Sequence, residues 1–330
     1  MGREKETKQA QTEGPDKEAA RGLLEKLKEK FKDAKRQKFV FLLIGRTGVG
    51  KSSTVNTLMG VQVAPVGDYE PTTFAIEAYE SQAYGIHFRI IDTPGLCDDL
   101  EEAGNDEAYL NRIMKNVAQL DCMLFVTRLP ETRVTSDEKR AIKLVTSALG
   151  PEVWEYSVIV FSFANSVSPD RYAEAVEKRT ELIRREIAKY TSDSLASEIP
   201  SVPIDNLSKH TPDGQEWLGS LYTNVFTRLH DKGLTAFFLA TADRLKVQGL
   251  ESKVSPTSPS TEGSDAHQPP PPPINLNPAQ ARILKKRIDG SIVGGMTITG
   301  AAIGAVFGPA GAAIGGAIGA AIGLIAWLSD

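Results

Sequence analysis

The sequence predicts an α/β fold with a mainly parallel sheet that is covered by helices on both faces. Three observations lead to this prediction. Apolar runs of strand length alternate with helix-like stretches from residue 38 to about residue 249. A glycine-rich loop directly follows the first apolar run and opens a helix. A polar turn at 92–95 ends the apolar run FRIID, at the sheet edge where ligands bind in open α/β folds.

The individual elements follow from the spacing of the apolar residues. Short apolar runs rich in β-branched and aromatic residues predict strands, and apolar residues three or four positions apart predict helices. Strands are expected at 39–45, 74–80, 87–95, 121–129, 157–165 and 201–206. Helices are expected near 51–60, 106–119, 136–148, 170–190 and 214–230.

The charge balance excludes one class of partner. The 330 residues carry 38 Lys and Arg against 42 Asp and Glu, a formal net charge of −4. A surface that binds nucleic acid needs a strong basic field, which this composition does not supply. No nucleic-acid partner is therefore expected.

Composition also divides the chain into parts. Polar residues 1–16 are expected to be disordered, and residues 17–37 to form a basic amphipathic helix. The α/β domain takes residues 38–249. Residues 250–278, rich in proline and serine, are expected to be a semi-rigid linker, with a proline-rich ligand as the alternative. Residues 279–330 comprise a basic flank and a glycine-rich tail.

The helix at 17–37 has two interpretations. Leu23, Leu27 and Phe31 recur every four residues on a lysine-rich background. An apolar stripe with basic flanks suits the surface of an anionic membrane. The same stripe suits a helix docked on the neighbouring domain with a solvated outer face, and we favour this interpretation.

The glycine-rich loop predicts a phosphate-binding site. Residues 45–52 fit the pattern G-x-x-x-x-G-K-[ST] between a strand and a helix, which is the context that the motif requires. Backbone N–H groups of such a loop surround phosphates, and the helix N-terminus adds partial positive charge. Lys51 would reach the β- and γ-phosphates, and the Ser52 hydroxyl would bind Mg²⁺. The expected phosphate-binding residues are Gly45, Arg46, Thr47, Gly48, Val49, Gly50, Lys51, Ser52 and Ser53.

Two further segments complete a nucleotide switch. Asp92 would hold Mg²⁺ through water, and the N–H of Gly95 would sense the γ-phosphate. Glu70-Pro71-Thr72-Thr73 stands just before a strand, where a threonine hydroxyl would complete the Mg²⁺ shell and lose its hold after hydrolysis. We favour Thr73 slightly over Thr72 for this role. The alternative is a turn that enters the strand. The expected metal ligands are Ser52, Thr72, Thr73 and Asp92.

Three stretches together resemble a known clan. GRTGVGKSSTVNTLMG, IIDTPGLCDD and TRLPETRVTSDEKRAIKLVTSALG are similar to the septin-related P-loop GTPases, which include the chloroplast outer-envelope import (Toc) GTPases and the immunity-associated nucleotide-binding proteins. The resemblance covers roughly residues 38–235. It implies a Ras-like domain, GTP or GDP as ligand with Mg²⁺, slow hydrolysis, and pairing with a second copy or a related GTPase across the nucleotide face.

The resemblance also suggests where guanine would bind. Ser162-Phe163-Ala164-Asn165 stands where Toc-type proteins have Thr-His-Ala-Gln or Thr-His-Ala-Asn, so Phe163 replaces a histidine that lies against the base. A phenyl ring keeps stacking but cannot donate a hydrogen bond. Asn206 resembles the family's base-contacting asparagine. The expected guanine contacts are Phe163, Asn165 and Asn206, with a core phenylalanine and a turn asparagine as the alternatives.

The catalytic residues are predicted less completely. Leu96 follows Gly95 where a Ras-type enzyme has a glutamine that positions water, so intrinsic hydrolysis is expected to be slow. Arg133 matches the arginine that Toc-type GTPases extend to the partner's nucleotide, and the alternative is a solvated charge before a helix. The expected catalytic residues are Lys51, Thr73, Gly95 and, in trans, Arg133.

The tail predicts association with a membrane. Residues 291–328 carry no charge, and glycine recurs every fourth position in two runs, at 300–308 and at 311–323, which lets helices approach closely. Gly308-Pro309 near the middle favours two short helices folded into a hairpin that contacts membrane lipid. One crossing helix with an interfacial piece and a glycine-zippered oligomer in water are the alternatives. The basic cluster at 285–287 would keep the α/β domain on the cytosolic side.

Two functions from different classes fit these features. The first is a membrane-associated GTP-binding switch that hydrolyses GTP slowly and acts on a protein effector. The second is an assembly protein in which the nucleotide supports polymerisation and the tail forms a membrane-active oligomer. A third possibility, an ATP-using P-loop enzyme, is disfavoured because no motif for an acceptor substrate is visible.

Overall fold

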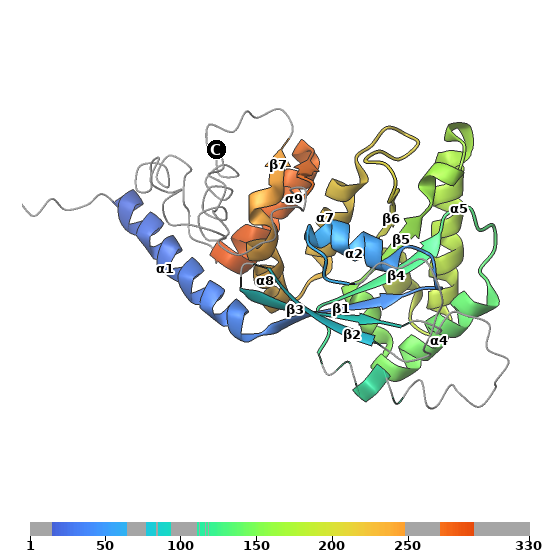
Figure 1. Cartoon of the computed structure of the whole chain (residues 1–330), viewed down its shortest axis with the longest axis horizontal. Helices are drawn as coiled ribbons and strands as arrows, with labels where there is room; N and C mark the ends of the chain where they lie inside the picture. The colour runs from blue at the N-terminus through green and yellow to red at the C-terminus, as the bar shows by residue number, and fades with distance from the viewer. Residues whose placement is uncertain are drawn as a thin grey trace, which may run out of the picture.

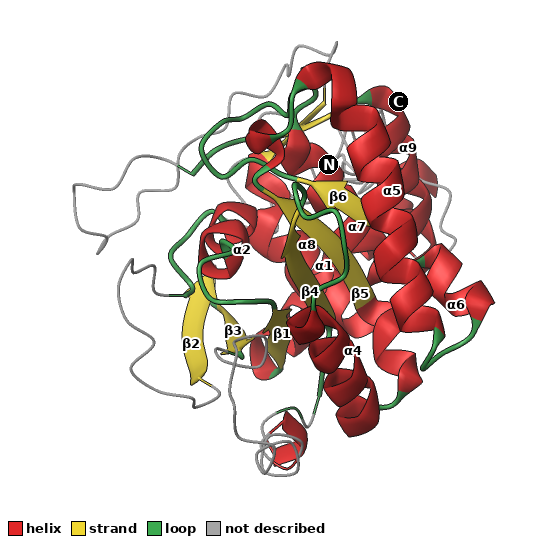
Figure 2. Ribbon diagram, turned by 90° about the vertical axis from the view of Figure 1, so that its right-hand side faces the viewer, coloured by secondary structure: helices red, strands yellow, loops and turns green. Residues whose placement is uncertain are grey.

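The computed structural model describes residues 15–64, 77–83, 85–93, 111, 113–115, 117, 119–247 and 271–293. Its centre is a six-stranded sheet in the order β2-β3-β1-β4-β5-β6 (Figures 1 and 2). Only β2 runs antiparallel to its neighbour in this sheet, and the other strands are parallel. The strands are β1 (Lys38–Ile44), β2 (Glu77–Ala83), β3 (Ile86–Asp92), β4 (Cys122–Arg128), β5 (Ser157–Ser162) and β6 (Ser201–Pro203).

Side chains on the central strands alternate between two buried layers. On β1, Phe39, Phe41 and Leu43 belong to one core, while Val40 and Leu42 belong to the other. Successive side chains of a strand point to opposite faces, so burial on both sides requires a cover on each face. The predicted α/β fold with a mainly parallel sheet covered on both faces is confirmed.

Different helices cover the two faces. The first face packs against α1 (Pro15–Arg36), α2 (Lys51–Met59), α7 (Trp217–Arg228) and α8 (Asp231–Thr241). The second packs against α4 (Ser136–Leu149), α5 (Pro169–Ala188) and α6 (Asp193–Glu198). The short helix η1 (Pro151–Tyr156) joins α4 to β5, η2 (Ala164–Ser166) joins β5 to α5, and η3 (Ala242–Arg244) follows α8.

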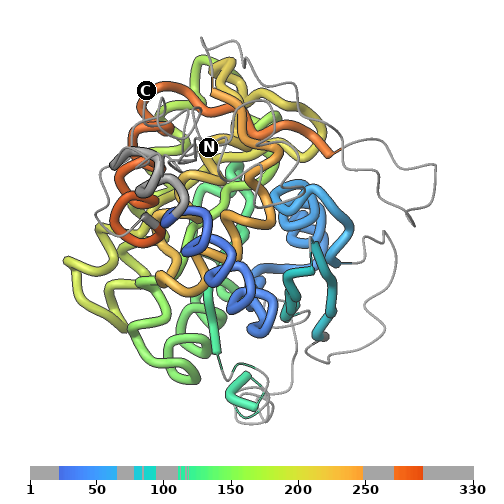
Figure 3. The backbone as a smooth tube through the Cα atoms, turned by 90° about the vertical axis from the view of Figure 1, so that its left-hand side faces the viewer, coloured from blue at the N-terminus to red at the C-terminus, as the bar shows by residue number. Residues whose placement is uncertain are grey.

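Helix α1 is docked on the domain. Leu23 and Leu27 are fully buried and Ala34 nearly so, and all three belong to the first core. The helix contacts α8 and β3, as Figure 3 shows from its side of the molecule. Of the two interpretations of this amphipathic helix, the structure supports the docked one, because the apolar stripe already has a protein partner.

The C-terminal part of the described chain differs from the expected linker. Residues 274–276 form β8 (Ile274–Leu276), which pairs in parallel with β7 (Leu245–Val247), and α9 (Pro278–Ile288) and the π-helical η4 (Asp289–Val293) follow. Ile274 and Leu276 are fully buried, and α9 packs against α7. Two apolar side chains in a three-residue strand are too short a pattern to stand out from a proline-rich stretch, so the sequence does not indicate the secondary structure at residues 274–293.

Some expectations fall outside the described residues. These include the polar residues 1–14, most of the linker and residues 294–330 of the glycine-rich tail. None of the helices formed by the described residues has both the length and the apolar character that a bilayer crossing requires. The hairpin and its alternatives therefore stay predictions.

Candidate nucleotide-binding site

The predicted phosphate-binding loop connects β1 to α2 at the carboxyl edge of the sheet. Gly45 lies against β4, where a Cβ atom would stand 2.2 Å from the carbonyl oxygen of Val126, so only glycine fits. Gly50 has a φ of 89° and is the N-cap of α2. The loop thus delivers the helix N-terminus, with its unpaired N–H groups, to the sheet edge.

Lys51 is buried at the centre of this loop, with 6% of its surface exposed. Its Nζ donates to the carbonyl oxygens of Gly45 and Arg46 at 2.9 and 3.1 Å. The same atom lies 3.6 Å from Oδ1 of Asp92. Asp92 comes from β3, which pairs with β1 so that Leu43 stands opposite Asp92. The loop between β1 and α2 and the end of the neighbouring strand β3 therefore bring the ammonium group and the carboxylate together.

The oxygen donors beside Lys51 fit a magnesium ion. Ser52 follows Lys51 at the start of α2 and is partly buried, and Asp92 is partly buried at the end of β3. Hydroxyl and carboxylate oxygens are the ligand types that Mg²⁺ prefers. Thr72, Thr73 and Gly95 lie outside the described residues, so their predicted roles stay predictions.

Thr93 follows Asp92 and anchors the end of β3. Its hydroxyl is buried and donates to the carbonyl oxygen of Leu43 at 2.9 Å. This bond ties the end of β3 to Leu43, near the end of β1 just before the loop. Sequence reasoning assigned Thr93 no role, although its place in the Asp-Thr-Pro-Gly turn was a signal for one.

The predicted base-contact residues lie on two loops beside the phosphate loop. Phe163 leaves β5 with a φ of 55°, which ends the strand earlier than expected. The guanidinium of Arg128 lies 4.2 Å from the Phe163 ring centroid, and the ring is half-buried. The N–H of Ala164 donates to the carbonyl of Ile204 at 3.2 Å, which joins this loop to the one that carries Asn206.

Asn206 contacts the phosphate-loop helix directly. Its Nδ2 lies 3.4 Å from the carbonyl oxygen of Gly50 and 3.3 Å from the hydroxyl oxygen of Thr54. Asn206 and Asn165 are both exposed. The structure therefore brings Asn206 to the phosphate loop. The Phe163 loop is joined to the Asn206 loop by the backbone bond between Ala164 and Ile204. The sequence motifs do not identify Arg128 as a partner of Phe163, although its position at the carboxyl end of β4, the sheet edge where ligands bind, is a signal for a site residue.

A buried ion pair fixes the loop that carries Arg133. Arg179 of α5 is 1% exposed and pairs with Glu138 of α4. Its Nη1 donates to the carbonyl of Arg133 at 2.7 Å, and its Nη2 donates to the hydroxyl of Thr127 at 2.8 Å. The side chain of Arg133 is exposed. The backbone at Arg133 is therefore held from inside while its guanidinium faces solvent.

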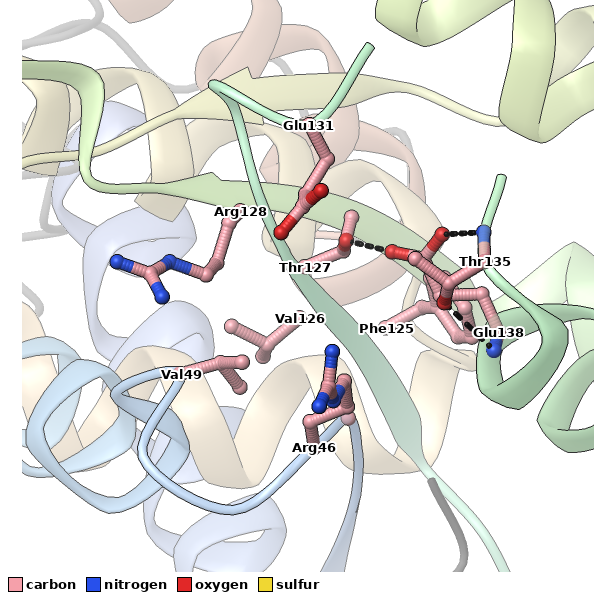
Figure 4. Close-up of a pocket in the computed structure, with 10 residues that line it drawn as sticks. Arg46, Val49, Phe125, Val126, Thr127, Arg128, Glu131, Thr135 and Glu138 are labelled. Carbon is pink, nitrogen blue, oxygen red and sulfur yellow. Dashed lines mark hydrogen bonds between the residues drawn. The ribbon is translucent and has the colours of Figure 1, made fainter. Parts of the chain in front are cut away.

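Glu138 also caps α4 and lines a small cavity beside the phosphate loop (Figure 4). Its carboxylate accepts from the N–H of Thr135, whose hydroxyl accepts from the N–H of Glu138, a capping box. Arg46 of the phosphate loop lies 3.5 Å from Asp137 in the same helical turn. The phosphate loop and the Arg133 loop are therefore connected through the first turn of α4.

Comparison with known proteins gives the family of this domain. Residues 40–194 match the AIG1 family. They form an AIG1 family domain. Within the chain, this AIG1 domain contains the phosphate loop, Asp92, Arg133 and the Phe163 loop. The predicted resemblance to the septin-related P-loop GTPases of the Toc and immunity-associated type is confirmed.

Curated relatives match parts of this chain. "GTP-binding protein A" of Dictyostelium discoideum is 39% identical over 131 residues, which are 39% of this chain and 29% of that protein. "Translocase of chloroplast 34, chloroplastic" of Arabidopsis thaliana is 29% identical over 215 residues, 59% of this chain and 67% of that protein. The chain thus spans less than a third of the first relative. The predicted enzyme class, a P-loop GTPase, agrees with this family and its relatives.

Solved structures are also similar. Toc33 from Arabidopsis thaliana in complex with GDP and Mg²⁺ is 28% identical, with a TM-score of 0.47, and the match covers 67% of this chain and 95% of that chain. Toc33 with Mg²⁺ and GMPPNP is 28% identical, with a TM-score of 0.47, covering 66% of this chain and 92% of that chain.

Proposed function

We propose that this chain is a GTP-binding switch that hydrolyses GTP slowly with Mg²⁺ and is regulated by pairing of its domains across the nucleotide face. The observation that carries the proposal is the buried ammonium of Lys51, held at the carboxyl edge of the sheet within 3.6 Å of Asp92. A phosphate group at the α2 N-terminus would receive hydrogen bonds from the loop N–H groups and from Lys51. Mg²⁺, when bound, would screen the phosphate charge, and Ser52 and Asp92 would hold it.

The proposal also assigns roles to the other predicted site residues and to the tail. Phe163 would stack on the base, and Asn165 and Asn206 would bind its polar edge. Thr73 and Gly95 would respond to the γ-phosphate, and Arg133 would reach a second copy's nucleotide. Association with a membrane through residues 291–328, with the domain on the cytosolic side, belongs to the same proposal. Its support is the uncharged, glycine-periodic sequence of the tail.

Nucleotide selectivity tests the proposal directly. The full chain with Mg²⁺ is expected to bind GDP and GTP at least about tenfold more tightly than ATP, since a hydrogen bond to the correct base is lost with the wrong one. Asn206→Ala is expected to lower this preference about tenfold. Affinities measured by calorimetry for GDP, GTP and ATP give the ratio.

The control for that experiment is Asn224→Ala. The Asn224 amide donates to Ser220 within α7 and has no role in the site. Its variant is expected to keep the wild-type preference. Equal affinity of the wild-type chain for ATP and GTP would contradict guanine recognition, and absence of any Mg²⁺-dependent nucleotide binding would contradict the whole proposal.

Arg133 has a test of its own. Arg133→Ala is expected to reduce nucleotide-linked dimerisation or the hydrolysis rate by about tenfold, because an exposed guanidinium directed at a partner's phosphates acts only in the pair. Its affinity for GDP as a monomer should not change. Sedimentation and phosphate-release assays measure both effects, and Lys139→Ala, an exposed cation on α4, is the control. Unchanged dimerisation together with unchanged hydrolysis would remove Arg133 from the site.

A further inference from the structure

Arg244 connects the phosphate-loop helix to the C-terminal segment. It ends η3 and is 6% exposed. Its Nη1 donates to the carbonyl of Leu58 at 2.7 Å and its Nη2 to the carbonyl of Thr57 at 2.9 Å. Its Nε donates to the carbonyl of Pro272 at 3.0 Å. One guanidinium therefore bonds two segments that are more than two hundred residues apart.

The first two bonds are made at the C-terminal end of α2. The last carbonyl groups of a helix have no partner within the helix, and a cation there interacts favourably with the helix dipole. Gly60, which follows the helix, leaves room for the guanidinium, because a Cβ atom there would stand 2.5 Å from Nη1. Since α2 begins at Lys51, Arg244 holds the opposite end of the helix that receives the phosphates.

The same turn of α2 also holds residues 63 and 64. Oδ1 of Asn56 accepts from the N–H groups of Val63 and Ala64 at 2.8 Å each, and its Nδ2 donates to the carbonyl of Ala64 at 2.7 Å. Beyond Ala64 the chain continues toward Thr72 and Thr73, which lie outside the described residues. The last turn of α2 therefore contacts both residues 63–64 and Arg244.

The third bond of Arg244 leads into the C-terminal segment. Pro272 precedes β8, which pairs with β7 directly after Arg244. Asn275 donates to Glu216 at 2.7 Å, and Gln280 donates to the hydroxyl of Ser220 at 3.0 Å, so the segment is bonded along α7. Residues 271–293 are thus docked on the domain, beside α1 in Figure 3.

We propose that Arg244 is a positioning residue that couples nucleotide binding at one end of α2 to docking of residues 271–293 at the other. This inference rests on the proposed function of the phosphate loop. The coupling is reciprocal, so nucleotide stabilises the docked segment and the docked segment tightens nucleotide binding. Residues 294–330 follow this segment in the sequence.

Amide hydrogen exchange of the full chain tests the coupling. Saturating GDP with Mg²⁺ is expected to slow exchange at residues 274–288 about fivefold or more, together with residues 51–59. Arg244→Gln is expected to abolish this difference at 274–288 and to weaken GDP binding about fivefold, because glutamine cannot bridge three carbonyls. Lys246→Gln, an exposed cation two residues along, is the matched control and is expected to behave as wild type.

The outcomes separate this inference from the proposed function. If GDP protects residues 51–59 but leaves 274–288 unchanged, or if Arg244→Gln keeps full protection, the coupling is wrong while nucleotide binding stands. If the wild-type chain binds no GDP, both are wrong. Should Arg244→Gln fail to fold, Arg244→Lys takes its place, because it keeps the charge but not the planar fork, and the same loss of protection is expected.

Discussion

Lys51→Ala is expected to weaken binding of GDP and GTP by about 100-fold to 1000-fold. The ammonium is buried among the loop carbonyls, so its charge acts on the phosphates with little screening by water. Its removal also leaves the carboxylate of Asp92 without the nearby positive charge, close to where the phosphates bind. A loss of 100-fold to 1000-fold is about 3–4 kcal/mol, in the lower part of the range of about 3–5 kcal/mol for breaking one half of a buried charge pair. Calorimetry with GDP and Mg²⁺ measures it.

Lys38→Ala is the matched control for this variant. Lys38 starts the same strand that Lys51 follows, but it lies at the opposite end of that strand and its side chain is 57% exposed, paired with Glu80 at 3.1 Å. Exposed pairs contribute about 0–1 kcal/mol. Nucleotide affinity is therefore expected to stay at the wild-type value. Wild-type affinity in Lys51→Ala would show that the phosphates bind elsewhere.

The sheet and the phosphate loop could be predicted from the sequence because their signals are local. Each central strand is a continuous apolar run, as burial on both faces demands, and the loop motif stands between its strand and its helix. The end of β5 was placed too late, at 165. Phe163 adopts a left-handed conformation that sequence patterns do not anticipate for a phenylalanine.

Contacts between distant segments could not be predicted in the same way. Arg179 and Glu138 each look like a surface residue of a charged helix, and only packing of α4 against α5 makes them a buried pair. Arg244 likewise has partners near residues 57 and 272, which no local pattern relates. The amphipathic stripe at 17–37 favours a docked helix over a membrane-surface helix only weakly, because such a stripe shows that a partner exists but not which one.

Loss of the buried Arg179–Glu138 pair is expected to have a large effect on stability. Arg179→Met is expected to lower the free energy of unfolding by about 3–5 kcal/mol, because it leaves the carboxylate of Glu138 buried without a counter-charge. Chemical denaturation of the full chain measures the change. Arg185→Ala, on the same helix, removes an exposed pair with Glu181 and is expected to change stability by less than about 1 kcal/mol. A similar loss in both variants would contradict the importance of burial.

A double variant separates stability from positioning. Arg179→Met with Glu138→Gln removes both charges. The one side-chain oxygen of glutamine can still accept from the N–H of Thr135, and its NH2 can donate to the hydroxyl of Thr127, so most of the lost stability is expected to return. The bond from Arg179 to the carbonyl of Arg133 is still missing in this variant. Nucleotide-linked dimerisation is therefore expected to stay weak although the domain is stable. Full recovery of dimerisation would mean that Arg179 supports the fold without positioning Arg133.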